Sequence, residues 1–90
     1  MSPSDKPKQK PDYHLEEMDN ELLLFHPQEK KVLYMNETTA LVWQLCDGQR
    51  TIQEITALLV ETFPDAAREI PGDLENILKQ LQQERVIELA

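Results

Sequence analysis

Cysteine and glycine are scarce in this 90-residue sequence, which has one cysteine and two glycines. A lone cysteine cannot form a disulfide within the chain. Gly48 and Gly72 stand far apart, so the sequence has no glycine-rich loop that would hold a phosphate group. No apolar stretch is long enough to cross a membrane, and no charged start followed by an apolar run indicates secretion. These absences favour a cytoplasmic protein without a membrane partner.

Basic side chains are also few, because nine Lys and Arg face 17 Asp and Glu, for a net charge of -8. Three of the lysines fall within residues 1–11, a polar stretch with three prolines that we expect to be a disordered tail. Residues 12–90, the predicted domain, then carry sixteen acidic and six basic side chains. Proteins that bind duplexes draw their affinity largely from Lys and Arg, so nucleic acid is not an expected partner. A partner with basic residues is favoured instead.

Short apolar runs in the first part of the chain predict three β-strands. They cover residues 13–18, Glu21–His26 and Lys31–Met35. The second and third runs are apolar on both faces, which implies that neither face of this small sheet is fully solvated. We therefore expect something to cover the second face.

Capping residues mark two helix starts and one stop in the middle of the chain. Asn36 is a good N-cap, because its side-chain oxygen can accept from a free amide of the first turn. Gly48 supplies the left-handed residue that ends this helix. Thr51 opens a second helix, and Glu54 completes a capping box with it. The sequence therefore predicts a helix, a tight corner and a second helix.

The predicted helices differ in how their apolar residues are distributed. The first is apolar on nearly all sides, so we expect it to be central, with Trp43 in the core. The second, residues 52–63, should lie on the outside and end at Pro64; its single apolar stripe is Ile52, Ile55, Leu58, Leu59 and Phe63. The third, residues 70–84, directs Leu74, Ile77, Leu78 and Leu81 inward. A short extended piece at residues 86–89 closes the chain.

This order of elements predicts the fold class. Three short antiparallel N-terminal strands followed by three helices make an α+β domain that is similar to a winged helix-turn-helix.

The sequence favours no catalytic, metal-binding or cofactor-binding site. Cys46 lies on an apolar helix with no histidine nearby, which is typical of a buried structural thiol. His14, His26 and Cys46 match no zinc spacing, and we expect the two histidines at the surface of strands. We therefore expect a protein that is not an enzyme, with no metal and no cofactor.

The central part of the sequence resembles the PqqD family of small peptide-binding proteins, named for the biosynthesis of pyrroloquinoline quinone (PQQ). The resemblance covers roughly residues 13–89. Its strongest matches are Asn36, Glu37, Thr38, Ala40, Trp43, Leu45, Asp47, Gly48, Thr51, Glu54 and Ile55, followed by the apolar positions of the third helix. The chain departs from the family pattern at Glu84-Arg85, where the family often has a glycine, and at Pro71-Gly72, near the start of the third helix.

The resemblance implies a recognition module that binds the leader of a ribosomally synthesised precursor peptide and presents it to a modifying enzyme, of which a radical SAM protein is one candidate. The leader would add as a strand to the edge at residues 31–35 and press side chains into a groove beside the third helix. The predicted peptide-binding residues are Lys31, Val32, Leu33, Tyr34, Met35, Asp73, Ile77, Gln80, Leu81 and Glu84.

Two other functions fit the same sequence. One is an adaptor that docks on a partner protein through the outer helix and never meets a peptide, in which case Lys30 and Lys31 merely blunt the strand edge. The other is a nucleic-acid-binding winged helix, which the net charge opposes.

Overall fold

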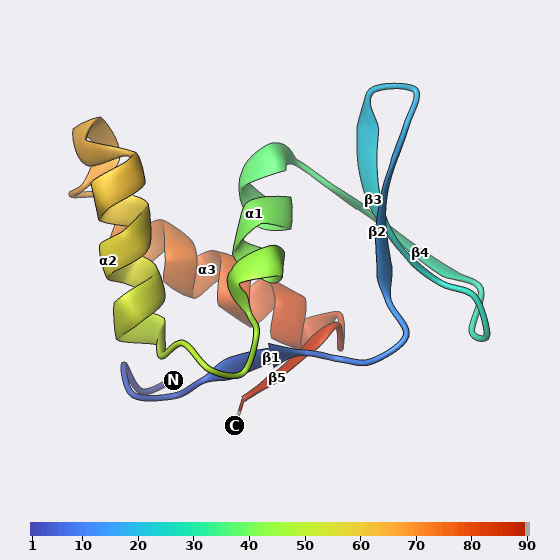
Figure 1. Ribbon diagram of the computed structural model, residues 1–90, viewed down its shortest axis with the longest axis horizontal. Helices are drawn as coiled ribbons and strands as arrows, with labels where there is room; N and C mark the ends of the chain where they lie inside the picture. Colours follow the sequence, from blue (N-terminus) through green and yellow to red (C-terminus); the bar gives the residue numbers. More distant parts are fainter. Residues whose placement is uncertain (90) are drawn as a thin grey trace.

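The chain folds into five strands and three helices, with most of the strands before the helices (Figure 1). The computed structural model describes residues 1–89. The elements are β1 (Pro7–Gln9), β2 (His14–Met18), β3 (Glu21–His26), β4 (Lys31–Met35), α1 (Glu37–Leu45), α2 (Ile52–Thr62), the 3-10 turn η1 (Pro64–Ala66), α3 (Ile70–Gln83) and β5 (Ile87–Leu89). The predicted α+β class is confirmed, and each predicted helix and strand is present within one or two residues of its expected bounds.

The sheet β2-β3-β4 is antiparallel and has β4 at one edge and β2 at the other. Residues directly opposite each other share a face, so the register assigns every side chain to one of two faces. The inner face carries Leu15, Glu17, Leu22, Leu24, His26, Lys31, Leu33 and Met35, and Leu24 is completely buried in the core. The outer face carries His14, Glu16, Met18, Glu21, Leu23, Phe25, Val32 and Tyr34. On this outer face Leu23 is buried, whereas Met18, Val32 and Tyr34 are exposed, so the expected shielding of the second face holds only at its centre.

Helix α1 lies in the centre, as predicted, and contacts both the sheet and α3. Its buried residues are Ala40, Val42 and Trp43. Trp43 is held in the core because its indole Nε1 donates to the Val86 carbonyl at 3.2 Å. Helices α2 and α3 add the apolar side chains of the core around it, which are Ile55, Leu59, Ile70, Leu74, Leu78 and Leu81.

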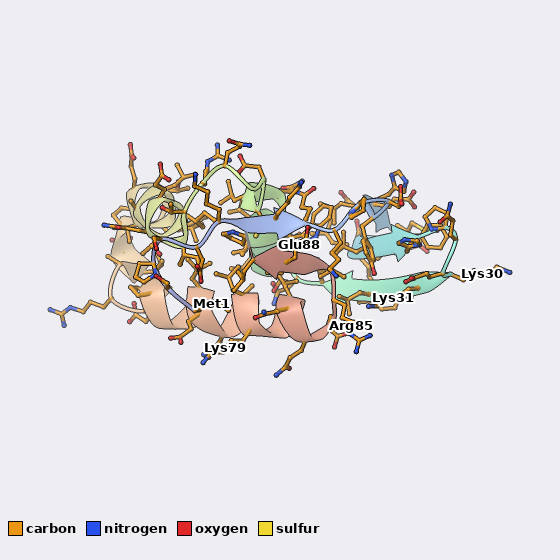
Figure 2. All side chains as sticks on the ribbon, turned by 90° about the horizontal axis from the view of Figure 1, so that it is seen from below. Met1, Lys30, Lys31, Lys79, Arg85 and Glu88 are labelled. Atoms are coloured by element: carbon orange, nitrogen blue, oxygen red, sulfur yellow. The ribbon has the colours of Figure 1, made fainter. Side chains whose placement is uncertain are left out.

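The first ten residues differ from the expected disordered tail. Pro7–Gln9 forms strand β1, which pairs antiparallel with β5 in a second sheet (Figure 2). Pro7 is buried, and its carbonyl accepts from the Gly48 amide at 3.0 Å. The carbonyls of Pro3 and Asp5 accept from two amides of the first turn of α2. Composition missed this strand because its backbone bonds join residues far apart in the sequence.

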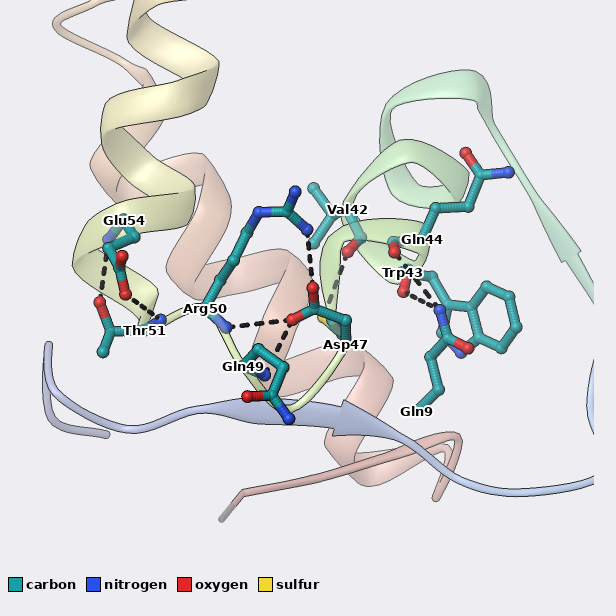
Figure 3. Close-up of polar contacts among 10 residues, drawn as sticks. Gln9, Val42, Trp43, Gln44, Asp47, Gln49, Arg50, Thr51 and Glu54 are labelled. Atoms are coloured by element: carbon teal, nitrogen blue, oxygen red, sulfur yellow. Dashed lines mark hydrogen bonds and ion pairs between the residues drawn. The ribbon is translucent and has the colours of Figure 1, made fainter.

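The corner between α1 and α2 has the predicted caps (Figure 3). The Asn36 side chain accepts from the Thr39 amide at 2.8 Å, and Thr51 and Glu54 form the complete capping box. Gly48 has a φ of +78°, and an added Cβ would meet the Lys8 side chain at 3.1 Å, so both the backbone and β1 require glycine here.

Asp47 fixes the same corner. Its Oδ1 accepts from the Gln49 and Arg50 amides at 2.9 and 3.0 Å, and its Oδ2 pairs with the Arg50 guanidinium at 2.8 Å. These backbone bonds, followed by the Arg50 charge, lower the pKa of the Asp47 carboxyl.

His26 is the one histidine whose predicted place was wrong. It is buried, because its Nδ1 accepts from the Glu29 amide at 3.1 Å and its ring packs edge-on to Tyr13 with centroids 4.9 Å apart.

No helix within residues 1–89 is both long and apolar enough to span a membrane.

We predict that Thr51→Ala lowers the free energy of unfolding by about 1 kcal/mol, because it removes the acceptor for an orphan amide of α2.

Glu54→Ala should also destabilise the protein at pH 7. Backbone and side-chain hydrogen bonds to Thr51 hold the pKa of Glu54 below its ordinary value. A depressed pKa contributes stability that is present above the ordinary value, about 4.3, and is lost as the pH falls through the folded value. The Glu54→Ala deficit should therefore shrink below about pH 4.

Urea unfolding at several pH values measures both effects. Gln53→Ala is the control, because Gln53 is an exposed residue in the same turn whose side chain makes no described hydrogen bond. A Glu54→Ala deficit that stays constant from pH 7 to pH 3 would contradict the role of the carboxylate.

We predict that deleting residues 2–9 lowers the free energy of unfolding by at least about 2 kcal/mol, since it removes several backbone hydrogen bonds worth about 0.5 to 1.5 kcal/mol each. The comparison with Lys6→Ala, which changes an exposed side chain and keeps the backbone, separates lost pairing from lost charge. If these residues were a disordered tail, the deletion would change the free energy of unfolding, measured with urea, by less than about 0.5 kcal/mol.

Candidate functional site

Strand β4 is an open sheet edge on the side of the sheet nearest α3 (Figure 2). Among residues 1–89, the backbone hydrogen bonds described outside the helices and sheets include none from residues 31–35. The backbone groups of β4 that point away from β3 are therefore free to bond an added strand. Strand β2, the opposite edge, is also open, but it carries Glu16 and Glu17.

The side chains of β4 alternate between the two faces of the sheet. Leu33 and Met35 point inward and pack against the core. Val32 and Tyr34 lie on the outer face and are 46% and 67% exposed. An added strand would therefore meet different parts of β4 on its two faces.

Helix α3 brings four of the predicted residues onto one stripe, here called the α3 stripe: Asp73, Ile77, Gln80 and Glu84. Spacings of three and four residues place side chains on the same helix face. Ile77 is half-buried, whereas Asp73 and Gln80 are exposed. Leu81, also predicted as a contact, is only 1% exposed and supports the stripe from within the core.

Lys31 joins β4 to the end of the α3 stripe. Its Nζ donates to the backbone carbonyl of Glu84, the C-cap residue of α3. The same ammonium lies 5.9 Å from the centroid of the Tyr13 ring. Figure 2 shows Lys31 beside the carboxyl end of α3, while Lys30 extends away from the body. Lys31 thus closes one end of the space between β4 and α3.

An apolar cavity of about 260 Å³ opens beside the other end of the α3 stripe. It lies between α1, the end of α2 and the first turns of α3. Its lining residues are Thr38, Val42, Leu59, Phe63, Ala66, Ile70, Asp73, Leu74 and Ile77. Of these residues, only Asp73 and Ile77 were predicted from the sequence as contacts, because the cavity joins three helices.

Phe63 is the most informative of the residues that were missed. The apolar stripe of α2 predicted that it points inward, yet it is 49% exposed and lines the cavity. The helix ends there, because Phe63 is the C-cap and Pro64 starts the next turn. The adjacent Pro64 was the sequence signal that the helix ends before residue 63, so that Phe63 no longer lies on the apolar stripe.

A second hollow, of about 600 Å³, lies at the far end of β4 and is acidic. Glu17, Glu21 and Glu37 line it together with Asn20, Leu22, Tyr34, Met35 and Asn36. The sequence did not predict this hollow, because its three carboxylates come from β2, β3 and α1, which only the fold brings together.

Neither the cysteine nor the histidines form a reactive constellation. Cys46 is completely buried, as predicted, and its thiol donates to the Val42 carbonyl at 3.1 Å. Burial, followed by the charge of Asp47, raises the pKa of Cys46 to about 12, so the thiol stays protonated at neutral pH. Within residues 1–89, no three His, Cys, Asp or Glu side chains gather in a way that could hold a metal ion.

The family model of coenzyme PQQ synthesis protein D (PqqD) matches residues 21–87. The matched residues include β3, β4, the three helices and the start of β5, and therefore both the open edge and the α3 stripe. No curated protein matches the chain, and no solved structure matches it. Because the family model covers most of the sequence, this chain belongs to the PqqD family.

Proposed function

We propose that this protein binds the leader of a ribosomally synthesised precursor peptide as an added strand on β4 and presents it to a modifying enzyme. The observation that carries the proposal is the open edge of β4 beside the α3 stripe, with an apolar cavity at one end. An exposed edge with an adjacent apolar site is the geometry of β-augmentation, in which backbone bonds give affinity and alternate side chains give specificity.

Membership of the PqqD family implies involvement in PQQ biosynthesis as a non-catalytic accessory protein with a peptide and an enzyme as partners. The mechanism proposed here is more specific than that membership. The winged helix-turn-helix arrangement that the sequence predicts is also part of this proposal. It concerns the way in which the strands flank the helices.

An added strand places its side chains in two rows. The inner row lies beside Leu33 and Met35 and faces the α3 stripe, so Ile77 is the natural contact for its apolar members. A side chain of the peptide that lies near the beginning of α1 reaches the apolar cavity. The outer row lies beside Val32 and Tyr34 and stays on the solvent side of the sheet.

Backbone hydrogen bonds alone do not supply the affinity. About four new bonds, at roughly 0.5 to 1.5 kcal/mol net each, give at most about 6 kcal/mol. Micromolar binding needs about 8 kcal/mol after the peptide has been ordered. One or two buried apolar anchors, at roughly 1.5 to 3 kcal/mol each, supply the difference. The apolar cavity and Ile77 are where such anchors fit.

The charges around the edge favour a leader with basic residues. Asp73 and Glu84 lie on the α3 stripe, and Glu17, Glu21 and Glu37 line the acidic hollow at the end of β4. Opposite charges placed this way speed association and select partners more than they raise affinity.

Nucleic-acid binding has little support from the surface of α3. Lys79 is the only basic residue of this helix, and its ammonium pairs with the Glu75 carboxylate at 3.2 Å. A recognition helix needs free cations for phosphate and base contacts. An adaptor function through α2 has no comparable open edge to support it.

We predict that short peptides encoded beside the gene shift the amide NMR signals of residues 31–35 and 73–84 in a saturable way. Strand β2 provides the internal control, because it is the other edge of the same sheet and carries acidic side chains. A duplex oligonucleotide at low salt should cause no shifts. Shifts confined to α2 would support the adaptor function instead, and shifts in β2 of equal size would mean that any open edge suffices.

We predict that Ile77→Asp weakens peptide binding at least about tenfold, because it removes an apolar anchor worth roughly 1.5 to 3 kcal/mol. The matched control is Asn76→Asp, which adds the same charge at an exposed neighbouring position of α3. Leu58→Ala, on the outer helix, should lower stability and leave the affinity unchanged. Calorimetric titration of folded samples measures the dissociation constants. Equal losses in Ile77→Asp and Asn76→Asp would contradict a contact at Ile77.

A further inference from the structure

The outer face of the β2-β3-β4 sheet exposes apolar side chains around a buried centre, Leu23. Met18, Val32 and Tyr34 are 56%, 46% and 67% exposed, and Phe25 is half-buried between Val32 and His14. These side chains come from all three strands and surround Leu23 on one face of the sheet. An exposed apolar patch of this kind marks an interaction site more often than chance exposure does.

The charges of the outer face have one sign. Glu16 lies opposite Leu23 in the central row, and Glu21 lies opposite Met18 at the end. No Lys or Arg belongs to this face, because Lys31 is on the inner face and Lys30 is in the turn. The face therefore fits a partner surface with an apolar centre and basic residues around it.

A second copy of this chain does not fit this face. Two copies packed face to face would lie about 10 Å apart, with Glu16 and Glu21 of each copy brought into a partly desolvated interface. Each chain also carries a net charge of -8. Like charges facing each other in such an interface are unfavourable.

The face also borders the proposed peptide. A strand added to β4 places its outer row of side chains next to Val32 and Tyr34, on the same face as Phe25 and Met18. The bound peptide therefore widens this surface by one strand. A protein that docks there contacts the module and the peptide together.

We propose that the outer face is the docking surface for the modifying enzyme, whose complementary surface is apolar with a basic rim, and that the bound leader completes this surface. The inference rests on the proposed function, since it assumes a leader strand on β4. The two rows of side chains on that strand then have different roles. The inner row binds this protein, and the outer row contacts the enzyme.

The test uses the purified modifying enzyme encoded beside the gene, with and without the leader peptide. The unaltered protein should bind the enzyme at least about tenfold more tightly when the peptide is present. Glu16→Lys and Met18→Ser should each weaken enzyme binding at least about threefold, and the Glu16→Lys loss should fall as salt is added. Neither variant should change the affinity for the peptide, because both lie on β2, two strands away from the β4 edge.

Glu61→Lys is the matched control. It makes the same charge change at an exposed position of α2, outside the sheet. Equal losses in Glu16→Lys and Glu61→Lys would overturn the docking surface, since they would reflect overall charge alone. If the affinity for the enzyme is the same with and without the peptide, the composite surface is overturned. If sedimentation shows a dimer that forms without the peptide and that Met18→Ser abolishes, the face is assigned to a second copy. A peptide that fails to bind the unaltered protein would overturn the proposed function itself, before the enzyme is added.

Discussion

The need to bury the apolar side of α1 organises the molecule. Ala40, Val42 and Trp43 of this helix are buried, so its neighbours have to pack against that side. The sheet and α3 contact α1, the buried residues of α2 join the same core cluster, and the Val86 carbonyl, just before β5, accepts from the Trp43 indole. The position of β4 beside α3 is a result of this packing, since β4 leads directly into α1 and α3 packs against it.

Local signals in the sequence were sufficient for most of the elements. Asn36, Gly48 and the Thr51–Glu54 box each act through the backbone of their own turn, so their effect can be read without the rest of the chain. Pairing between distant segments could not be read in this way. Strand β1 has no apolar run, and its place depends on carbonyls and amides contributed by residues 46–48, 52–53 and 86.

The site shows the same division. The α3 stripe was predictable, because helical spacing alone aligns Asp73, Ile77, Gln80 and Glu84. The side on which each β4 residue lies depends on the register with β3, which places Val32 and Tyr34 on the outer face. The apolar cavity and the acidic hollow each combine residues from several elements, and no single segment carries their pattern. The apolar residues on both faces of β3 agree with the burial of Leu24 on the inner face and of Leu23 on the outer face.

The pairing of β1 with β5 joins the two ends of the chain, and this has a kinetic consequence. Contacts between residues so distant in sequence carry the largest loop-closure cost, so this small sheet can form only after α1, α2 and α3 have brought the ends together. With three residues in each strand, the sheet has few backbone bonds of its own, and its stability depends on the buried Pro7 and Ile87. When it opens, the first-turn amides of α2 lose the carbonyls of Pro3 and Asp5, so fraying of the amino terminus spreads to the outer helix while β4 and its edge stay folded.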